Sequence, residues 1–208
     1  MKLALCAIPL FVVATCSAQQ SGLVPSSKQH FVITEAKTIS IAELQQRNQS
    51  KARGTFADAK MAARRGDHSR SITLFEKALK TDPLFSDARN DLAVELIVSG
   101  QTDRAVDQLQ QLVQLDPRFL IAYTNLGVVL CNQKKFPEAE AVVRRALNID
   151  PNSSKASLLL GLALYAQGNR GAETQSALEI AARSNPLAAK LLKQWFGVSD
   201  VADTAAPN

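Results

Sequence analysis

The chain has 208 residues, enough for one domain or two small ones with a sizeable core. Hydrophobic residues make up 46% and charged residues 21%, which excludes a disordered polyelectrolyte and a polytopic membrane protein. The net charge of +5 is too small and too scattered to indicate nucleic acid binding. Three Cys and two His are too few for a zinc cluster or a disulfide scaffold, so we expect no metal and no cofactor.

Residues 1–18 have the features of a secretory signal peptide. A lysine precedes an apolar run over 3–13, and small residues come after it. The run is too short to span a bilayer, which takes about 20 residues. We therefore predict cleavage after Ala18 and export to the periplasm or the exterior. The alternative is a lipoprotein box ending at Cys16, which would anchor the protein through a lipid on that cysteine.

Residues 19–49 differ in composition from the rest of the chain. The segment begins rich in Ser and Gln, which predicts a flexible leader. Short β-branched runs at 31–33 and 39–41 predict a short extended segment. As an alternative, Ser40 and Glu43 have the spacing of a capping box, which would begin a helix that runs into the first part of the repeats.

A period of 34 residues organises the chain from about residue 50 to 186. Asp-Pro pairs place Pro83, Pro117 and Pro151 at that spacing, and Pro186 lies 35 residues after the third. Such a period is typical of stacked helical hairpins. A turn column accompanies the prolines, and it is mostly glycine, which tolerates the left-handed conformation that ends many helices. The turn column consists of Gly66, Gly100, Lys134 and Gly168.

These columns resemble the pattern of the tetratricopeptide repeat family. The third unit matches it best, with Tyr123, Leu126, Gly127, Leu130, Ala139, Val143, Ala146 and Pro151. The resemblance implies an all-α, right-handed α-solenoid of about four helix-turn-helix repeats. The repeats would span about 52–85, 86–119, 120–153 and 154–186. We predict their helices at 50–65, 69–81, 86–99, 102–115, 119–133, 136–149, 153–167 and 171–184.

A ninth helix is predicted at 187–196. It carries Leu191, Leu192, Trp195 and Phe196 on one broad apolar side. The last repeat of a solenoid exposes an apolar face, and a capping helix can cover it. We therefore predict that 187–196 is the cap and that 197–208 is a loose tail.

No motif for catalysis is present in the sequence. It contains no nucleophile elbow, no phosphate loop and no His-Glu-x-x-His. Basic pairs at 64–65, 134–135 and 144–145 have no interleaved aromatic residues, so they indicate solvated surface rather than a nucleic acid site. We predict a protein that is not an enzyme.

The resemblance places a partner-binding groove on the concave side, formed by the first helix of each repeat. By register, its basic end holds Arg53, Phe56, Lys60 and Arg64. The remaining groove positions are mostly apolar, and an apolar groove in a soluble protein indicates a partner. They are Asn90, Val94, Ile97, Val98, Thr124, Val128, Asn132, Lys155, Leu158, Leu162 and Tyr165.

The predicted function is an exported, non-enzymatic protein–protein interaction scaffold that binds a protein or peptide segment in this groove. The alternative is an envelope assembly or tethering factor attached through Cys16. A second alternative concerns the groove itself, because its side chains would also be explained by packing on the next helix or on the leader. The identity of the partner and the oligomeric state are left open.

Overall fold

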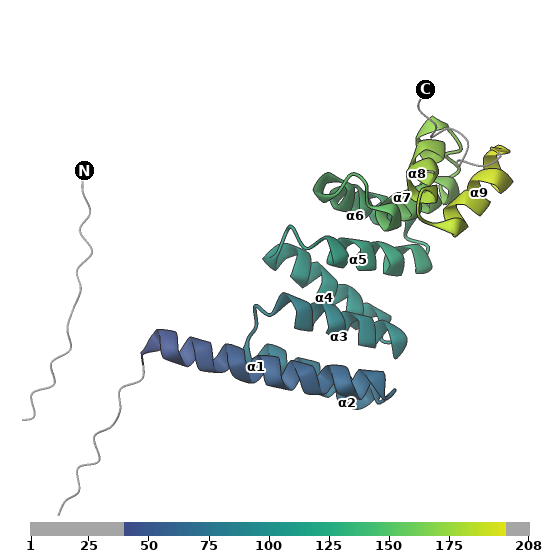
Figure 1. Cartoon of the computed structure of the whole chain (residues 1–208). Helices are drawn as coiled ribbons and strands as arrows, with labels where there is room; N and C mark the ends of the chain where they lie inside the picture. Colours follow the sequence, from purple (N-terminus) through teal and green to yellow (C-terminus); the bar gives the residue numbers. More distant parts are fainter. Residues whose placement is uncertain (1–39, 199–208) are drawn as a thin grey trace, which may run out of the picture. The chain divides into compact units, whose positions relative to one another are not determined.

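The computed structural model describes residues 40–198, and this part of the chain forms nine α-helices and no strand (Figure 1). Each helix packs against the next one along the chain. The predicted all-α solenoid of helical hairpins is confirmed. The helices are α1 (Ile41–Arg64), α2 (His68–Thr81), α3 (Ser86–Val98), α4 (Thr102–Leu115), α5 (Leu120–Asn132), α6 (Phe136–Ile149), α7 (Ser154–Ala166), α8 (Ala172–Ala182) and α9 (Pro186–Phe196).

The predicted signal peptide, residues 19–39 of the predicted leader and, within it, the run at 31–33 lie outside the described residues. Most of the predicted tail, from 199 onward, also lies outside them. Within residues 40–198, no helix is both long enough and apolar enough to cross a membrane.

Helix α1 begins at Ile41, nine residues before the predicted start. The Ser40 side chain accepts a hydrogen bond from the backbone N–H of Glu43 at 3.1 Å, and the Glu43 carboxylate accepts one from the Ser40 N–H at 2.9 Å. This capping box satisfies two backbone donors that a helix start leaves open. The leader boundary at 49 is therefore corrected, because 41–49 are helical and Ile41 is not in an extended segment.

Small residues let the two helices of a repeat approach closely. A Cβ atom added to Gly127 of α5 would lie 2.6 Å from Cγ2 of Val143 in α6. A Cβ atom added to Gly161 of α7 would lie 2.7 Å from Cδ2 of Leu178 in α8. Both distances are shorter than van der Waals contact, so a larger residue at either glycine would push the helices apart.

One residue of the turn column, Lys134, is not a glycine. Gly66, Gly100 and Gly168 adopt φ values of 78°, 75° and 85°. Lys134 adopts the same left-handed conformation at φ 60°, and it is the one non-glycine residue with positive φ between 40 and 198. An L side chain is disfavoured there, so this turn is strained relative to the other three.

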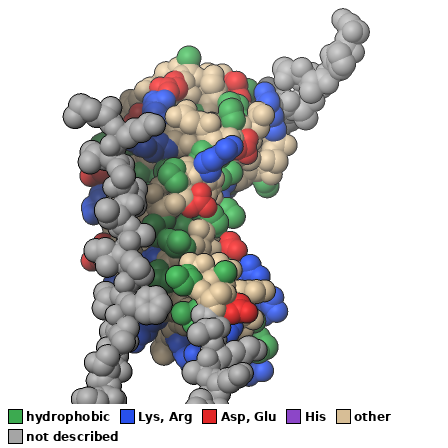
Figure 2. Space-filling view, turned by 90° about the vertical axis from the view of Figure 1, so that its left-hand side faces the viewer, with side chains coloured by type: hydrophobic (Ala, Val, Ile, Leu, Met, Phe, Trp, Pro, Cys, Tyr) green, Lys and Arg blue, Asp and Glu red, His purple; other side chains and the backbone are tan. Residues whose placement is uncertain are grey.

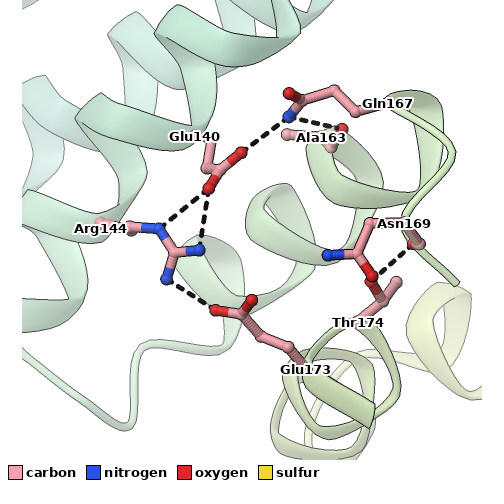
Figure 3. A network of polar contacts seen from close by, with 7 residues as sticks. All are labelled: Glu140, Arg144, Ala163, Gln167, Asn169, Glu173 and Thr174. Carbon is pink, nitrogen blue, oxygen red and sulfur yellow. Dashed lines mark hydrogen bonds and ion pairs between the residues drawn. The ribbon is translucent and has the colours of Figure 1, made fainter. Parts of the chain in front are cut away.

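A polar network joins the third repeat to the fourth (Figure 3). The Arg144 guanidinium of α6 donates to Glu140 at 2.8 Å and to Glu173 of α8 at 2.7 Å. The Gln167 amide donates to the other oxygen of Glu140 at 2.8 Å. These hydrogen bonds, from Arg144 first and Gln167 second, hold the pKa of Glu140 below its ordinary value.

Helix α9 covers the C-terminal end of the stack, as predicted, and begins one residue earlier than expected. Leu192 is fully buried in a cluster with Leu178 and Ala181 of α8. Trp195 stacks on Tyr165 of α7, with ring centroids 3.6 Å apart.

Candidate functional site

The spacing between the first helices of successive repeats changes along the stack. Helix α5 contacts α7 most closely, α3 contacts α5 less closely, and α1 contacts α3 least. A cavity of about 230 Å³ opens between α1 and α3, the pair of first helices with the least extensive contact. It is lined by Lys60, Ala63 and Arg64 of α1, Phe75 of α2, and Asp91, Val94 and Glu95 of α3.

The predicted basic residues of α1 are exposed. Arg53 and Arg64 have solvent-accessible side chains, and Arg64 lines the cavity. The Lys60 ammonium lies 3.9 Å from a carboxylate oxygen of Asp91. It also lies 5.3 Å from the centroid of the Phe56 ring. Lys60 therefore already faces an internal anion and an aromatic ring.

Phe56 has a structural role that the groove register did not predict. Its ring lies 5.7 Å from that of Phe75 and 4.8 Å from that of Phe85, centroid to centroid. It is half-buried and packs against the main hydrophobic core. Phe56 therefore joins the first repeat to the start of the second, and only part of its ring is accessible.

Three carboxylates on α3 form an acidic wall that we did not predict as a unit. Asp87, Asp91 and Glu95 lie at intervals of four residues, so they share one helix face. Glu95 is buried and its carboxylate accepts a hydrogen bond from Nδ1 of His68 at 2.8 Å. The four-residue spacing is the signal in the sequence that could have found this wall. No group of His, Cys, Asp and Glu within 40–198 is arranged to hold a metal ion.

A polar ladder crosses the middle of the site. The Asn125 amide of α5 donates to Oδ1 of Asn90 in α3 at 3.0 Å. Lys155 of α7 donates to Oδ1 of Asn125 at 2.9 Å. Burial lowers the pKa of Lys155. The register had placed Asn90 and Lys155 in the groove, whereas Asn125 was missed because it lies one residue beyond the predicted position.

Apolar side chains flank this ladder on α3 and α5. Val94 and Val98 are exposed, and so is Ile121, at the start of α5. The half-buried predicted residues are Ile97 and Val128, while Asn132 is exposed. Thr124 is buried and donates to the backbone of its own helix. On the face that Figure 2 shows, hydrophobic side chains gather in patches among charged side chains of both signs.

The C-terminal part of the predicted groove is covered by the chain itself. Leu158 is buried, and Leu162 packs in the same cluster as residues of α9. Tyr165 is stacked against Trp195. We expected these three side chains to face a partner, but the structure places them against the capping helix. Asn90 and Thr124 are likewise buried, so they support the groove wall instead of presenting a free side chain.

Comparison with known proteins agrees with this architecture. The family model described as Tetratricopeptide repeat matches residues 62–127 and 96–163. Residues 62–163 are therefore tetratricopeptide repeats. No curated protein sequence matches it.

Solved structures with low sequence identity share the fold. MamA from Desulfovibrio magneticus RS-1 is 20% identical with a TM-score of 0.64, covering 70% of this chain and 83% of that chain. YrrB, described as a protein with an unusual peptide-binding site, is 21% identical with a TM-score of 0.59, covering 74% and 85%. The first repeat domain of Spaghetti, bound to an HSP90 peptide, is 20% identical with a TM-score of 0.56, covering 58% and 95%.

Proposed function

We propose that this chain is a non-enzymatic scaffold that binds an extended protein segment across α1, α3 and α5, with Lys155 of α7 at the far edge. The observation that carries the proposal is the set of exposed valines on α3 beside the polar ladder. Apolar surface next to a few directed polar groups is the usual composition of a recognition site.

The ladder supplies hydrogen-bond donors rather than acceptors. The Oδ1 atoms of Asn90 and Asn125 both accept hydrogen bonds within the ladder. The hydrogens left over for a ligand belong to the Asn125 amide and to the Lys155 ammonium, since Asn90 is buried and its amide donates to Asp91. An extended peptide offers a row of backbone carbonyl oxygens, which are acceptors. The ladder therefore suits the backbone of such a segment, and the valines suit its apolar side chains.

Two structural neighbours support a peptide ligand. One is described as having a peptide-binding site, and the other is bound to a peptide. At identities of 20% and 21% these proteins share only the fold with this chain, so we do not infer that it binds the same ligand.

The test is a selection of binding peptides from a random library on residues 19–208, followed by calorimetry on matched variants. Val98→Asp should weaken the binding of the selected peptide by about tenfold or more, because it removes an apolar contact and introduces a charge. Leu115→Asp is the control, since Leu115 on α4 is similarly exposed, 51% against 59% for Val98. Equal losses for the two variants, or no selected peptide, would refute the proposal.

We further propose that the protein is exported and acts outside the cytoplasm. The support is the sequence of residues 1–18, with its basic start, apolar run and small-residue end. Mass spectrometry of the mature protein distinguishes the two forms of export. A chain beginning at Gln19 indicates soluble export, and a diacylglyceryl group on Cys16 indicates a tethered envelope factor. An intact Met1 with unmodified Cys16 would contradict both.

A further inference from the structure

The cavity between α1 and α3 combines an apolar floor with charged walls. Ala63 and Val94 supply its apolar surface, and Phe75 lies at its base. Phe75 is almost completely buried, so the cavity reaches down to the core of the first repeat. A volume of about 230 Å³ is sufficient for one large side chain, and it is too small for a folded element.

The anions of this cavity are more deeply buried than its cations. The side chains of Asp91 and Glu95 are 30% and 12% exposed, whereas that of Lys60 is 46% exposed and Arg64 is exposed. An ion pair with a half-exposed lysine is worth little, because water and salt already stabilise that charge. A partially buried carboxylate has lost much of this solvation, so a new cation beside it gains more.

The Asp91 carboxylate is also poorly compensated. It accepts one hydrogen bond, from the neighbouring Asn90 amide at 3.3 Å. Lys60 lies 3.9 Å away, beyond hydrogen-bond distance. Burial raises the pKa of Asp91, and the nearby charges of Asp87 and Glu95 raise it further, against the lowering effects of Asn90 and Lys60.

Glu95 offers a second acceptor in the same cavity. Its Oε2 atom accepts the hydrogen bond from His68, and its Oε1 atom has no hydrogen-bond partner among the described residues. The two carboxylates line the cavity one helical turn apart on α3. A single cationic group placed between them would donate charge-assisted hydrogen bonds to both.

We infer that this cavity is an anchoring site for an arginine or lysine side chain of the bound segment. The aliphatic part of that side chain packs along Ala63 and Val94, and its cationic head reaches Asp91 and Glu95, displacing the Lys60 ammonium. The inference rests on the proposed function and adds the chemistry of one partner residue. It depends on the buried carboxylates of α3 rather than on the exposed basic residues that the register placed at this end.

The experiment uses small probes that carry only the side chain. N-acetyl-arginine amide is titrated into the full mature chain, and backbone amide shifts are followed by NMR. N-acetyl-citrulline amide is the neutral control of the same shape, and N-acetyl-glutamate amide carries the opposite charge. We expect shifts on α1 and α3 around the cavity, with the arginine probe bound at least about fivefold more tightly than the citrulline probe.

The sign of the Lys60 effect separates a cation site from an anion site. Lys60→Ala removes the internal competitor, so it should strengthen arginine binding by about two- to fivefold. Lys51→Ala is the matched control, because Lys51 is exposed on α1 and does not line the cavity. It makes the same change in net charge, and it should alter binding less than about twofold. Asp91→Asn should weaken arginine binding by about fivefold or more.

Three results would overturn the inference: equal binding of arginine and citrulline probes, tighter binding of glutamate, or weaker arginine binding in Lys60→Ala. Absent shifts at the cavity with every probe would count the same way. The proposed function is judged separately by the selected peptide and Val98→Asp. If a peptide binds but the arginine probe does not, only the anchoring site is refuted. If the arginine probe binds but no peptide is selected, only the proposed scaffold function is refuted.

Discussion

The two ends of the predicted groove have the same helical register, but one is open and the other is covered by the chain itself. At the α1–α3 end, a cavity remains open and is lined by cations facing carboxylates. At the α7–α9 end, Leu162 and Tyr165 are packed against the chain's own last helix. Val94 and Leu162 hold the same position in their repeats, yet Val94 is exposed and Leu162 is half-buried against a core cluster. The groove register therefore places a residue on a helix face without determining what covers that face.

The difference arises from the element that comes next in the chain. The first helix of a repeat is covered by the repeat that follows it. Within residues 40–198, the fourth repeat is followed by α9 alone, and α9 takes over this covering. That helix presents Leu192, Leu191 and Trp195 to α7 and α8, as the first helix of another repeat would. The α1–α3 interface lies between two complete repeats, but α1 contacts α3 less extensively than later first helices contact each other, and charged side chains line the opening.

The largest effect on stability is expected at the α7–α9 end, here called the closed end. Leu192→Ala should reduce the free energy of unfolding by about 2–5 kcal/mol, because Leu192 is fully buried in the C-terminal cluster. Urea unfolding followed by circular dichroism measures the loss. Leu187→Ala on the same helix is the control, since Leu187 is half exposed and should cost less than about 0.5 kcal/mol. Equal midpoints for the two variants would mean that α9 does not cap the stack.

A second pair of variants compares the ends directly. Leu162→Asp should cost about 1–3 kcal/mol of stability, because the new carboxylate would lie in the cluster with α9. Val94→Asp, at the same repeat position, should change stability by less than about 0.5 kcal/mol, since Val94 is exposed. Thermal melts of both variants measure the difference. If Leu162→Asp melts with the wild type, the closed end is open in solution.

The repeats were predictable from the sequence because their constraints are local and periodic. The proline spacing, the turn column and the small residues Gly127 and Gly161 are each required by one helix hairpin. The start of α1 was predicted at 50 and lies at Ile41. The nine residues were missed because the capping box lies in a polar segment without the apolar period of the repeats. The alternative based on Ser40 and Glu43 was correct, since a cap is a local hydrogen-bond pattern.

The groove was predictable only in part, because its surface depends on contacts between repeats. Register alone could not show that Tyr165 stacks on Trp195, since the two residues are 30 positions apart. It also could not show that Lys60 faces Asp91 or that Asn125 joins Asn90 to Lys155. These pairings depend on the distance between neighbouring first helices, which varies along the stack.

The turn between α5 and α6 provides a smaller, stabilising test in the region between the two ends. Lys134→Gly should raise the free energy of unfolding by about 1 kcal/mol, because glycine adopts the left-handed conformation without the strain of a side chain. Gly100→Ala, in the equivalent turn of the second repeat, should have the opposite sign and a similar size. Urea midpoints of the two variants measure both. A destabilised Lys134→Gly would show that the lysine side chain contributes contacts that outweigh the strain.

The smallest predicted effect gives the two ends opposite pH dependence. Asp91, at the open end, has a raised pKa, so its ionised form disfavours folding at neutral pH. Glu140, near the closed end, has a lowered pKa, so its ionised form favours folding above about pH 4.3, the ordinary glutamate value, and that contribution is lost as the pH falls through the folded-state pKa.

Neutral substitutions separate these two contributions. At pH 7, Asp91→Asn should be more stable than the wild type and Glu140→Gln less stable, each by less than about 1 kcal/mol. Toward pH 3 both differences should shrink, because the unfolded chain takes up protons on both carboxylates below their ordinary pKa values. The stabilising effect of Asp91→Asn should fade as the pH falls through the raised pKa toward about 3.9, the ordinary aspartate value. Urea unfolding at the two pH values measures the four differences, and the same sign for both variants at pH 7 would show that the carboxylates at the two ends do not differ in their compensation.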